Sequence, residues 1–319
     1  ISMSVPMSTW KGTAPVRQGK IARDFHKNWF PYLAFVPVLI WFIVFCYGPM
    51  WGVLIAFKDF KPLLGFAKSE WVGLQHFRDF ISGPDFGRQF RNTVLLSLWG
   101  LAIGFPIPIL LAIMINELRG RFFKKSVQTI TYMPHFISIV VICGIIHIFT
   151  QPYGLLTNLI SFFTGATANR SLLGEAGLFR PVYTLSGVWQ NMGWDSIIYL
   201  AAMSNISPEL YESADLDGAG RVGKIWRITL PGIRPTILIL LIFAVGGMMN
   251  SNWEKIILLY NPLTYETADV FSTYVYRRGI REGSFSFSTA VGLFNSVINF
   301  LLLLFTNAIS RRFSETSLW

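Results

Sequence analysis

Residues 31–57 read PYLAFVPVLIWFIVFCYGPMWGVLIAF and contain no charged side chain. The hydrocarbon core of a bilayer is about 30 Å thick, and a helix needs about 20 apolar residues to cross it. This stretch meets that requirement. It therefore predicts a membrane-spanning helix.

Five further stretches have the same character. They cover residues 93–116, 127–150, 181–203, 235–253 and 283–309. Asp195 is the only Asp, Glu, Lys or Arg within them. Their prolines and glycines are tolerated because neighbouring helices satisfy the backbone groups that these residues free. The sequence thus predicts an all-α integral membrane protein with a domain of six transmembrane helices, residues 31–309.

Composition excludes other classes of protein. Of the 319 residues, 52% are hydrophobic and 14% are charged, whereas soluble domains have about 25% charged residues. A soluble enzyme or a disordered chain is therefore excluded. The net charge of +10 would suggest nucleic acid in a soluble protein, but here the basic residues flank apolar runs, as contacts to lipid headgroups do. We expect membrane lipids and no nucleic acid as partners.

The basic residues also predict an orientation. Six spans place both termini on one side of the membrane. Lys and Arg are denser in the N-terminal segment 1–30, the loop 117–126, the loop 205–230 and the C-terminal tail 310–319 than in the other three loops. Because positive loops stay inside, both termini are predicted to be cytoplasmic.

The loop between the fourth and fifth spans carries the most information. Residues 207–231 read SPELYESADLDGAGRVGKIWRITLP, and we call them the 207–231 loop. Ser207 before Pro208 is typical of a helix start, and Asp217-Gly218 is typical of a turn. A second short helix is expected over 219–229, ended by Leu230-Pro231, which begins the fifth span. This pattern predicts a rigid helix–turn–helix in the cytoplasm.

Within this loop, ESADLDGA (212–219) and ITLP (228–231) resemble the EAA loop of ABC importer permeases. Ser213 stands where that family often has Ala. The six spans match the type I importer core, so the resemblance covers most of the chain. YMPHFIS (132–138), PGIRPT (231–236) and AVGLFNSVI (290–298) are similar to maltose-type sugar permeases. The likeness is greatest to the subgroup that imports large oligosaccharides, such as alginate or pectin fragments, and within it to the alginate importers.

The resemblance implies a bacterial inner-membrane subunit that passes a saccharide inward by alternating access. Its partners would be a second homologous permease, two ATP-binding subunits and a solute-binding protein, although a homodimer stays open. This chain would hold no cofactor, metal or catalytic residue, since ATP and Mg would bind the partner subunits. The residues that would contact the ATP-binding subunit are Glu212, Ala214, Asp217, Gly218, Ala219, Leu230 and Pro231.

Polar residues inside the spans are the candidates for a substrate pathway, because they are costly in lipid. Amides beside aromatic rings suit sugars. The candidates are Gln190, Asn191, Trp194, Asp195, Asn250, Asn252, Trp253 and Asn295. Interhelical hydrogen bonds explain Asn295 and Asn299 equally well.

One alternative function remains. An ion-coupled secondary transporter would show internal repeats and paired carboxylates. This chain has no evident repeat, and Asp195 is the one carboxylate within the predicted spans.

An anionic saccharide would favour a cationic entrance, which Arg277, Arg278 and Arg281 with Lys255 would supply. Headgroup binding or docking of the solute-binding protein explains the three arginines as well.

Overall fold

The computed structural model describes residues 28–165 and 167–313. Residues 1–27 of the predicted N-terminal segment and residues 314–319 of the predicted C-terminal tail lie outside this range. The chain divides into two units, residues 1–54 and 55–319. Each is described by itself.

The first unit contains one long helix. It comprises α2 (Trp29–Trp41), a π-helical turn η1 (Phe42–Tyr47), α3 (Gly48–Met50) and the start of the 3-10 helix η2 (Trp51–Phe57). Large apolar side chains such as Phe30, Trp41 and Phe45 are exposed along it. A helix that is apolar on all sides suits a lipid environment, as the sequence predicts for residues 31–57.

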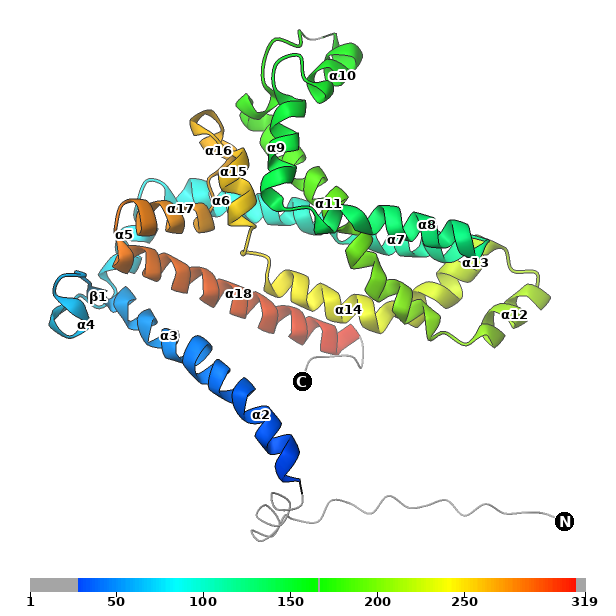
Figure 1. The fold of residues 1–319 in the computed structure, drawn as a ribbon, viewed down its shortest axis with the longest axis horizontal. Helices are drawn as coiled ribbons and strands as arrows, with labels where there is room; N and C mark the ends of the chain where they lie inside the picture. Colours follow the sequence, from blue (N-terminus) through cyan, green and yellow to red (C-terminus); the bar gives the residue numbers. More distant parts are fainter. Residues whose placement is uncertain (1–27, 166, 314–319) are drawn as a thin grey trace. The chain divides into compact units, whose positions relative to one another are not determined.

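The second unit is almost entirely helical (Figure 1). Its first part contains β1 (Lys58–Asp59), α4 (Gly65–Lys68), β2 (Glu70–Trp71), α5 (Gln75–Ile81), α6 (Phe86–Trp99), η3 (Gly100–Gly104), α7 (Pro106–Glu117), α8 (Arg121–Tyr132), η4 (Met133–Phe136), α9 (Ile139–Thr150) and α10 (Leu155–Thr164). Its second part contains η5 (Leu172–Gly174), α11 (Ala176–Ser204), α12 (Pro208–Leu216), α13 (Arg221–Lys224), η6 (Ile225–Thr229), α14 (Leu230–Gly246), α15 (Trp253–Leu259), η7 (Pro262–Thr264), α16 (Tyr265–Ala268), α17 (Phe271–Tyr276), η8 (Arg277–Arg281) and α18 (Phe285–Phe313). Strands β1 and β2 pair antiparallel.

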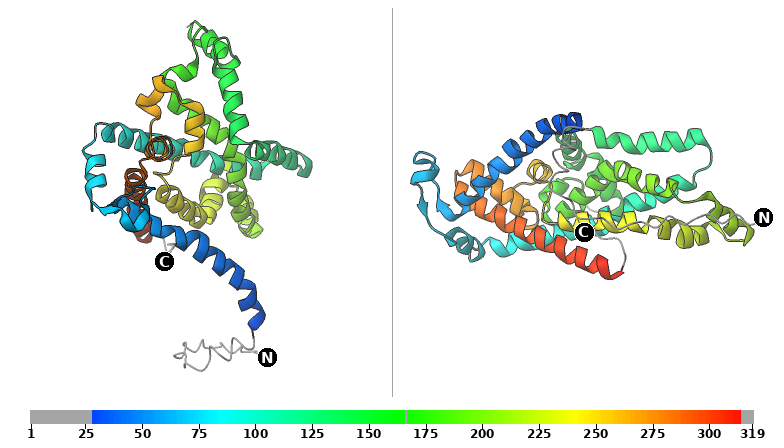
Figure 2. Two further views of the ribbon diagram at one scale, coloured as in Figure 1. Left: turned by 60° about the vertical axis from the view of Figure 1, so that its left-hand side comes forward. Right: turned by 90° about the horizontal axis from the view of Figure 1, so that it is seen from below.

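Two helix pairs organise this unit. Helix α11 packs along α7, and α14 packs along α18, as Figures 1 and 2 show. Tyr199 and Met203 of α11 are buried against Ala112 of α7 and Ile233 of α14. Helix α11 is therefore at the centre of the unit, in contact with both pairs.

Among the described residues, four helices are long and apolar enough to cross a membrane. They are Trp29–Phe57, Phe86–Glu117, Arg221–Gly246 and Phe285–Arg311. A fifth crossing would be formed by Arg121–Phe136 and Ile139–Thr150, which meet at 95°. The predicted span at 127–150 is therefore not one straight helix but is broken in its middle. Pro134 lacks an N–H and opens a 3-10 turn, and Ile137 then adopts an extended backbone with ψ 131°.

The remaining predicted crossing, at residues 181–203, lies within helix α11. Its 29 residues span about 43 Å at 1.5 Å per residue, enough for a bilayer. It is less apolar than the other spans because Arg180, Gln190 and Asp195 belong to it. The six-span arrangement stays a prediction for this reason.

The predicted boundary at Leu230-Pro231 is also wrong, because Arg221–Gly246 is one continuous helix. Proline in a helix removes one hydrogen bond and crowds the carbonyl four residues earlier. The turn before Pro231 widens into the π-helical η6, which gives that carbonyl room. At the other end α14 stops at Gly246, short of the predicted end at residue 253.

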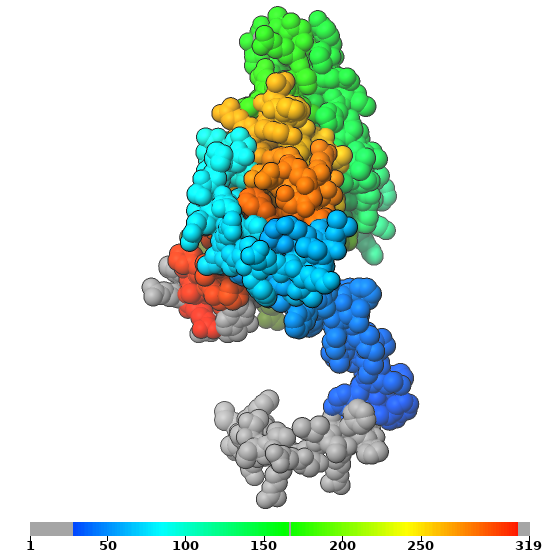
Figure 3. All heavy atoms as spheres, turned by 90° about the vertical axis from the view of Figure 1, so that its left-hand side faces the viewer, coloured from blue at the N-terminus to red at the C-terminus, as the bar shows by residue number. Residues whose placement is uncertain are grey.

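A buried charge network joins α6 to the segment 265–281 (Figure 3 shows α17 in orange beside α6 in cyan). The Asp269 carboxylate, which is 0% exposed, accepts hydrogen bonds from Arg277 at 2.9 and 3.0 Å and forms an ion pair with Arg88 at 3.4 Å. Asn92 of α6 donates to the Asp269 carbonyl at 3.0 Å. Burial lowers the pKa of Arg277, but its hydrogen bonds to Asp269 outweigh this and raise that pKa above its ordinary value, so Arg277 stays charged.

Helices α8 and α11 approach so closely that only glycine fits at position 193. A Cβ there would lie 2.0 Å from the Thr131 carbonyl oxygen. We expect Gly193→Ala to cost about 1–3 kcal/mol of stability by overpacking, measured as a lower thermal midpoint of the detergent-solubilised protein. Gly144→Ala is the matched control, since a Cβ at this exposed α9 position meets nothing within 4 Å. Equal midpoints for the two variants would contradict this account of the α8–α11 contact.

Candidate functional site

The chain leaves the helix between α14 and α15, at residues 247–252. Three other helices satisfy the backbone of this break. The Met249 N–H donates to Asn299 of α18 at 2.9 Å, and the Asn252 N–H donates to the Tyr183 hydroxyl of α11 at 3.2 Å. The Met248 carbonyl accepts from the Ser97 hydroxyl of α6. Side chains thus replace the helical hydrogen bonds, as apolar surroundings require.

An amide cluster fixes the middle of the break. The Asn250 side-chain oxygen accepts hydrogen bonds from Asn295 and Asn299, both at 3.0 Å. Asn295 and Asn299 lie four residues apart on one face of α18. The interhelical interpretation of these two residues therefore agrees with the contacts.

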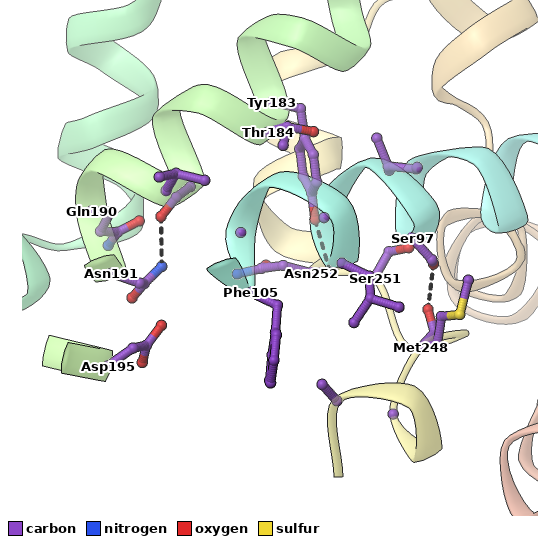
Figure 4. A pocket seen from close by; sticks show the side chains of 18 of the residues that line it. Ser97, Phe105, Tyr183, Thr184, Gln190, Asn191, Asp195, Met248, Ser251 and Asn252 are labelled. Atoms are coloured by element: carbon purple, nitrogen blue, oxygen red, sulfur yellow. Dashed lines mark hydrogen bonds between the residues drawn. The ribbon is translucent and has the colours of Figure 1, made fainter. Parts of the chain in front are cut away.

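A cavity of about 410 Å³ lies beside the break. Its walls come from α6 and η3, from α11, and from residues 247–252. Figure 4 shows Gln190, Asn191 and Asp195 along α11 and Ser251 and Asn252 across from them. Amide and hydroxyl groups with the aromatic rings of Phe105 and Tyr183 line it. This mixture suits a polyhydroxylated ligand.

A second cavity of about 660 Å³ continues along α11. It shares Phe105 and Asp195 with the first cavity and extends to Tyr199 and Leu240. Its other lining residues are mostly apolar. The two cavities together follow α11 towards the 207–231 loop.

An aromatic and polar cluster lies where η4 meets α11. His135 forms a hydrogen bond of 3.0 Å with the Asn191 side chain. Its ring stacks on Trp194, with centroids 4.5 Å apart and planes 3° apart. The bend after Pro134 brings His135 to this place, so the helix break near residue 137 and the cavity wall are linked.

The predicted pathway residues divide into three groups. The first cavity is lined by Gln190, Asn191, Asp195, Asn250 and Asn252, and Trp194 lines the second. Trp253 and Asn295 line neither of these two. Trp253 instead stacks on Tyr276 with centroids 5.2 Å apart. Contact of any of them with a substrate stays a prediction.

Sequence reasoning missed several lining residues, among them Ser97, Phe105 and Tyr183. Ser97 is the one hydroxyl between Leu96 and Gly100 in an apolar run, which is a weak signal for a polar partner. Phe105 and Tyr183 are aromatic residues in aromatic-rich spans. Only the pairing of α6 with α11 distinguishes them from ordinary core residues.

The 207–231 loop forms the expected helix–turn–helix. Helix α12 ends in a Schellman motif, in which Gly218 has φ +73°. The Ala219 N–H donates to the Ala214 carbonyl at 2.8 Å, and the Gly218 N–H donates to the Asp215 backbone carbonyl at 3.1 Å. This motif needs a left-handed residue, usually glycine. Helix α12 begins at Pro208 with Ser207 as its N-cap residue, as expected, although the Ser207 side chain makes no capping hydrogen bond.

Two contacts hold the two arms of the loop together. Lys224 of α13 forms an ion pair with Asp215 of α12 at 2.6 Å, and the hydroxyls of Tyr211 and Thr229 are 2.9 Å apart. Leu216 at the tip is 90% exposed. Four large apolar side chains are exposed on the loop: Leu210, Leu216, Val222 and Trp226. These contacts brace the loop, and it carries exposed apolar surface.

Of the predicted loop residues, Glu212, Asp217 and Gly218 are exposed and Ala214 and Ala219 are half-buried. Leu230 and Pro231 lie apart from the turn, in the continuous helix. Their contact with an ATP-binding subunit stays a prediction.

We expect Asn299→Ala to destabilise the break. It would leave the buried Met249 N–H without a partner, at a cost of about 1–3 kcal/mol. Thermal unfolding of the solubilised protein measures this loss. Asn295→Ala is the matched control, because among the residues that the structure describes the Asn295 side chain bonds only to Asn250 and its own oxygen has no partner. Equal losses for the two variants would contradict the assigned role of Asn299.

Comparisons with known proteins agree with this architecture. The model of a family described as binding-protein-dependent transport system inner membrane component matches residues 104–315. Protein LplB of Bacillus subtilis (strain 168) is 45% identical over 90% of this chain and 90% of its own length. The polygalacturonan/rhamnogalacturonan transport system permease protein YteP of the same organism is 44% identical over 90% of this chain and 89% of its own.

A solved structure also matches. It is the crystal structure of a bacterial alginate ABC transporter in complex with an alginate pentasaccharide-bound periplasmic protein. One of its chains has a TM-score of 0.85 and 43% identity, covering 94% of this chain and 100% of that chain. Since the family model and these relatives cover most of the sequence, this chain belongs to the family of binding-protein-dependent transport system inner membrane components.

Proposed function

We propose that this chain is a permease subunit of an ABC importer for oligosaccharides, with acidic oligosaccharides of the alginate or pectin type as substrates. The observation that carries the proposal is the cavity beside the helix break. It combines the amides Gln190, Asn191 and Asn252 with the rings of Phe105 and Tyr183. The printed names of two relatives, a polygalacturonan/rhamnogalacturonan permease and an alginate transporter, support the substrate class.

The saccharide would pass along α11. It would enter the first cavity, move past Phe105 and Asp195 into the second, and leave near Tyr199. Phe105 and Asp195 line both cavities. Alternating access would require the cavities to open to one side at a time, and relative movement of α11 and α14 would do this.

The 207–231 loop would couple that movement to ATP. Its exposed apolar side chains and its rigid turn suit docking into a groove of a separate ATP-binding subunit. Helix α11 ends at Ser204 and α12 begins at Pro208. Displacement of the loop would therefore act directly on the helix that lines both cavities.

The complete importer would contain a second homologous permease, two ATP-binding subunits and a solute-binding protein. ATP hydrolysis would take place in the ATP-binding subunits. Both termini and the 207–231 loop would lie in the cytoplasm, with the segment 58–91 outside. The many apolar side chains exposed on the described helices leave room for a second permease as well as lipid.

Affinity purification from the native membrane, with mass spectrometry of co-eluting proteins, tests the proposal. We expect an ATP-binding subunit and a second permease. The purified complex in proteoliposomes should then import an oligosaccharide when ATP and the loaded solute-binding protein are present. A chain that elutes alone and drives uptake with an ion gradient would instead support the secondary transporter.

Substitution at Gly218 tests the coupling role. Gly218→Val places a β-branched residue at φ +73°, which costs about 1–2 kcal/mol or more, and should abolish most substrate-stimulated ATPase activity of the complex. Gly218→Asn should retain it, because Asn tolerates the left-handed conformation. A Cβ at 218 meets no atom within 4 Å, so the two variants differ in backbone strain rather than packing.

Gly120→Val is the control for strain elsewhere. Gly120 also has a positive φ, +89°, and open space around it, and it lies outside the 207–231 loop. We expect its stimulated ATPase activity to stay close to that of the wild type. If all three variants behaved alike, the loop would not be the coupling element.

A further inference from the structure

Lys255 is buried in the wall of the first cavity. It follows the helix break as the third residue of α15, and it is 3% exposed. Its ammonium group donates to the Tyr183 carbonyl at 3.0 Å and lies 5.1 Å from the centre of the Tyr183 ring. Gly187 leaves room for it, since a Cβ there would be 3.3 Å from Nζ.

Lys255 has no counter-ion in the described part of the chain, where no carboxylate forms an ion pair with it. Glu254, its neighbour in sequence, is exposed and forms no ion pair with it. An ammonium group has three donors, and the Tyr183 carbonyl takes one of them.

The acidic residue of the cavity lies elsewhere. Asp195 is eight residues beyond Gly187 on α11, which corresponds to about 12 Å along a helix. It borders the second cavity, whereas Lys255 lines only the first of the two. The first cavity therefore has a cationic end at Lys255 and an acidic end at Asp195.

A buried charge without a partner is costly, and ionisable residues within membrane proteins mark transport pathways by default. We propose that Lys255 binds the carboxylate of an acidic sugar unit as the oligosaccharide passes through the cavity. This inference rests on the function proposed above and assigns its charge selectivity to one residue. Arg277 and Arg278 need not carry it, since Arg277 pairs with Asp269 and Arg278 with Glu282.

Binding of this kind explains the local geometry. The Tyr183 carbonyl and ring stabilise the ammonium group while the cavity is empty. Two remaining donors are available to a carboxylate. A uronic acid chain carries one carboxylate on each sugar, so successive units would meet Lys255 in turn. The contact does not hold the chain permanently, because each incoming carboxylate can replace the one before it.

The test is uptake by the complete importer in proteoliposomes, with its ATP-binding subunits, second permease and solute-binding protein. The probes are galacturonate and mannuronate pentasaccharides and the same sugars with methyl-esterified carboxyls. Uptake by each variant is divided by wild-type uptake of the same probe. This ratio cancels the preference of the solute-binding protein.

We expect Lys255→Gln to reduce uptake of the acidic probes at least about tenfold, as loss of one partner of a buried charge contact does, and to leave the ratio for the esters near one. Gly187→Ala is a second variant that keeps the charge but crowds the ammonium group, and it should impair acidic probes selectively. Lys125→Gln, at an exposed position of α8, is the control and should match the wild type.

Three outcomes would overturn the inference. Equal reduction for acidic and esterified probes would make Lys255 structural, and no reduction would remove it from the pathway. In both cases wild-type uptake would leave the proposed function intact. Failure of the wild type to import either acidic probe would overturn the acidic substrate class and this inference together, and uptake of neutral sugars would then still support an oligosaccharide importer.

Discussion

Within hydrocarbon, a backbone N–H or C=O without a hydrogen-bond partner costs several kcal/mol. This constraint decides where the chain can leave the helix. Residues 247–252 do so because Ser97, Tyr183 and Asn299 supply partners from three different helices. The break is therefore not a flexible interruption. It is held by side chains of three helices, and two of them, Ser97 and Tyr183, also line the first cavity.

Helix α11 is fixed by two kinds of contact. Towards one end, the bare backbone at Gly193 lets α8 approach to van der Waals distance. Towards the other, Arg180 donates to Asn92 at 3.0 Å and so joins α11 to the network around Asp269. Gln190 and Asn191, which line the first cavity, lie between these anchors, and Asp195 lies two residues beyond Gly193. A helix that carries Gln190 and Asp195 is stable in a membrane because its polar face meets protein and cavity rather than lipid.

The cavities and the 207–231 loop share this helix. Residues on α11 line both cavities, and only residues 205–207 separate the end of α11 from the start of α12. The Schellman turn at Gly218 and the Lys224–Asp215 ion pair make the loop a rigid unit. Under the proposed function, a push on the loop would reach the saccharide pathway through one helix. Lys255 and Asp195 would give that pathway charged groups of opposite sign.

The sequence by itself determined the helical class, most of the spans and the turn at Gly218, because apolar run length and glycine's conformational freedom are local properties. It also placed Gln190, Asn191 and Asn252 at a polar site, since amides are conspicuous in apolar runs. Tertiary structure alone decided that the helices break at residues 137 and 247–252 and that α14 runs through Pro231. These features depend on partners that lie far away in sequence, such as Asn299 at the second break and Gln190, whose amide donates to the Ile137 carbonyl at 3.4 Å. The solitary charge of Lys255 has the same origin, because only the packed fold shows which carboxylates are out of its reach.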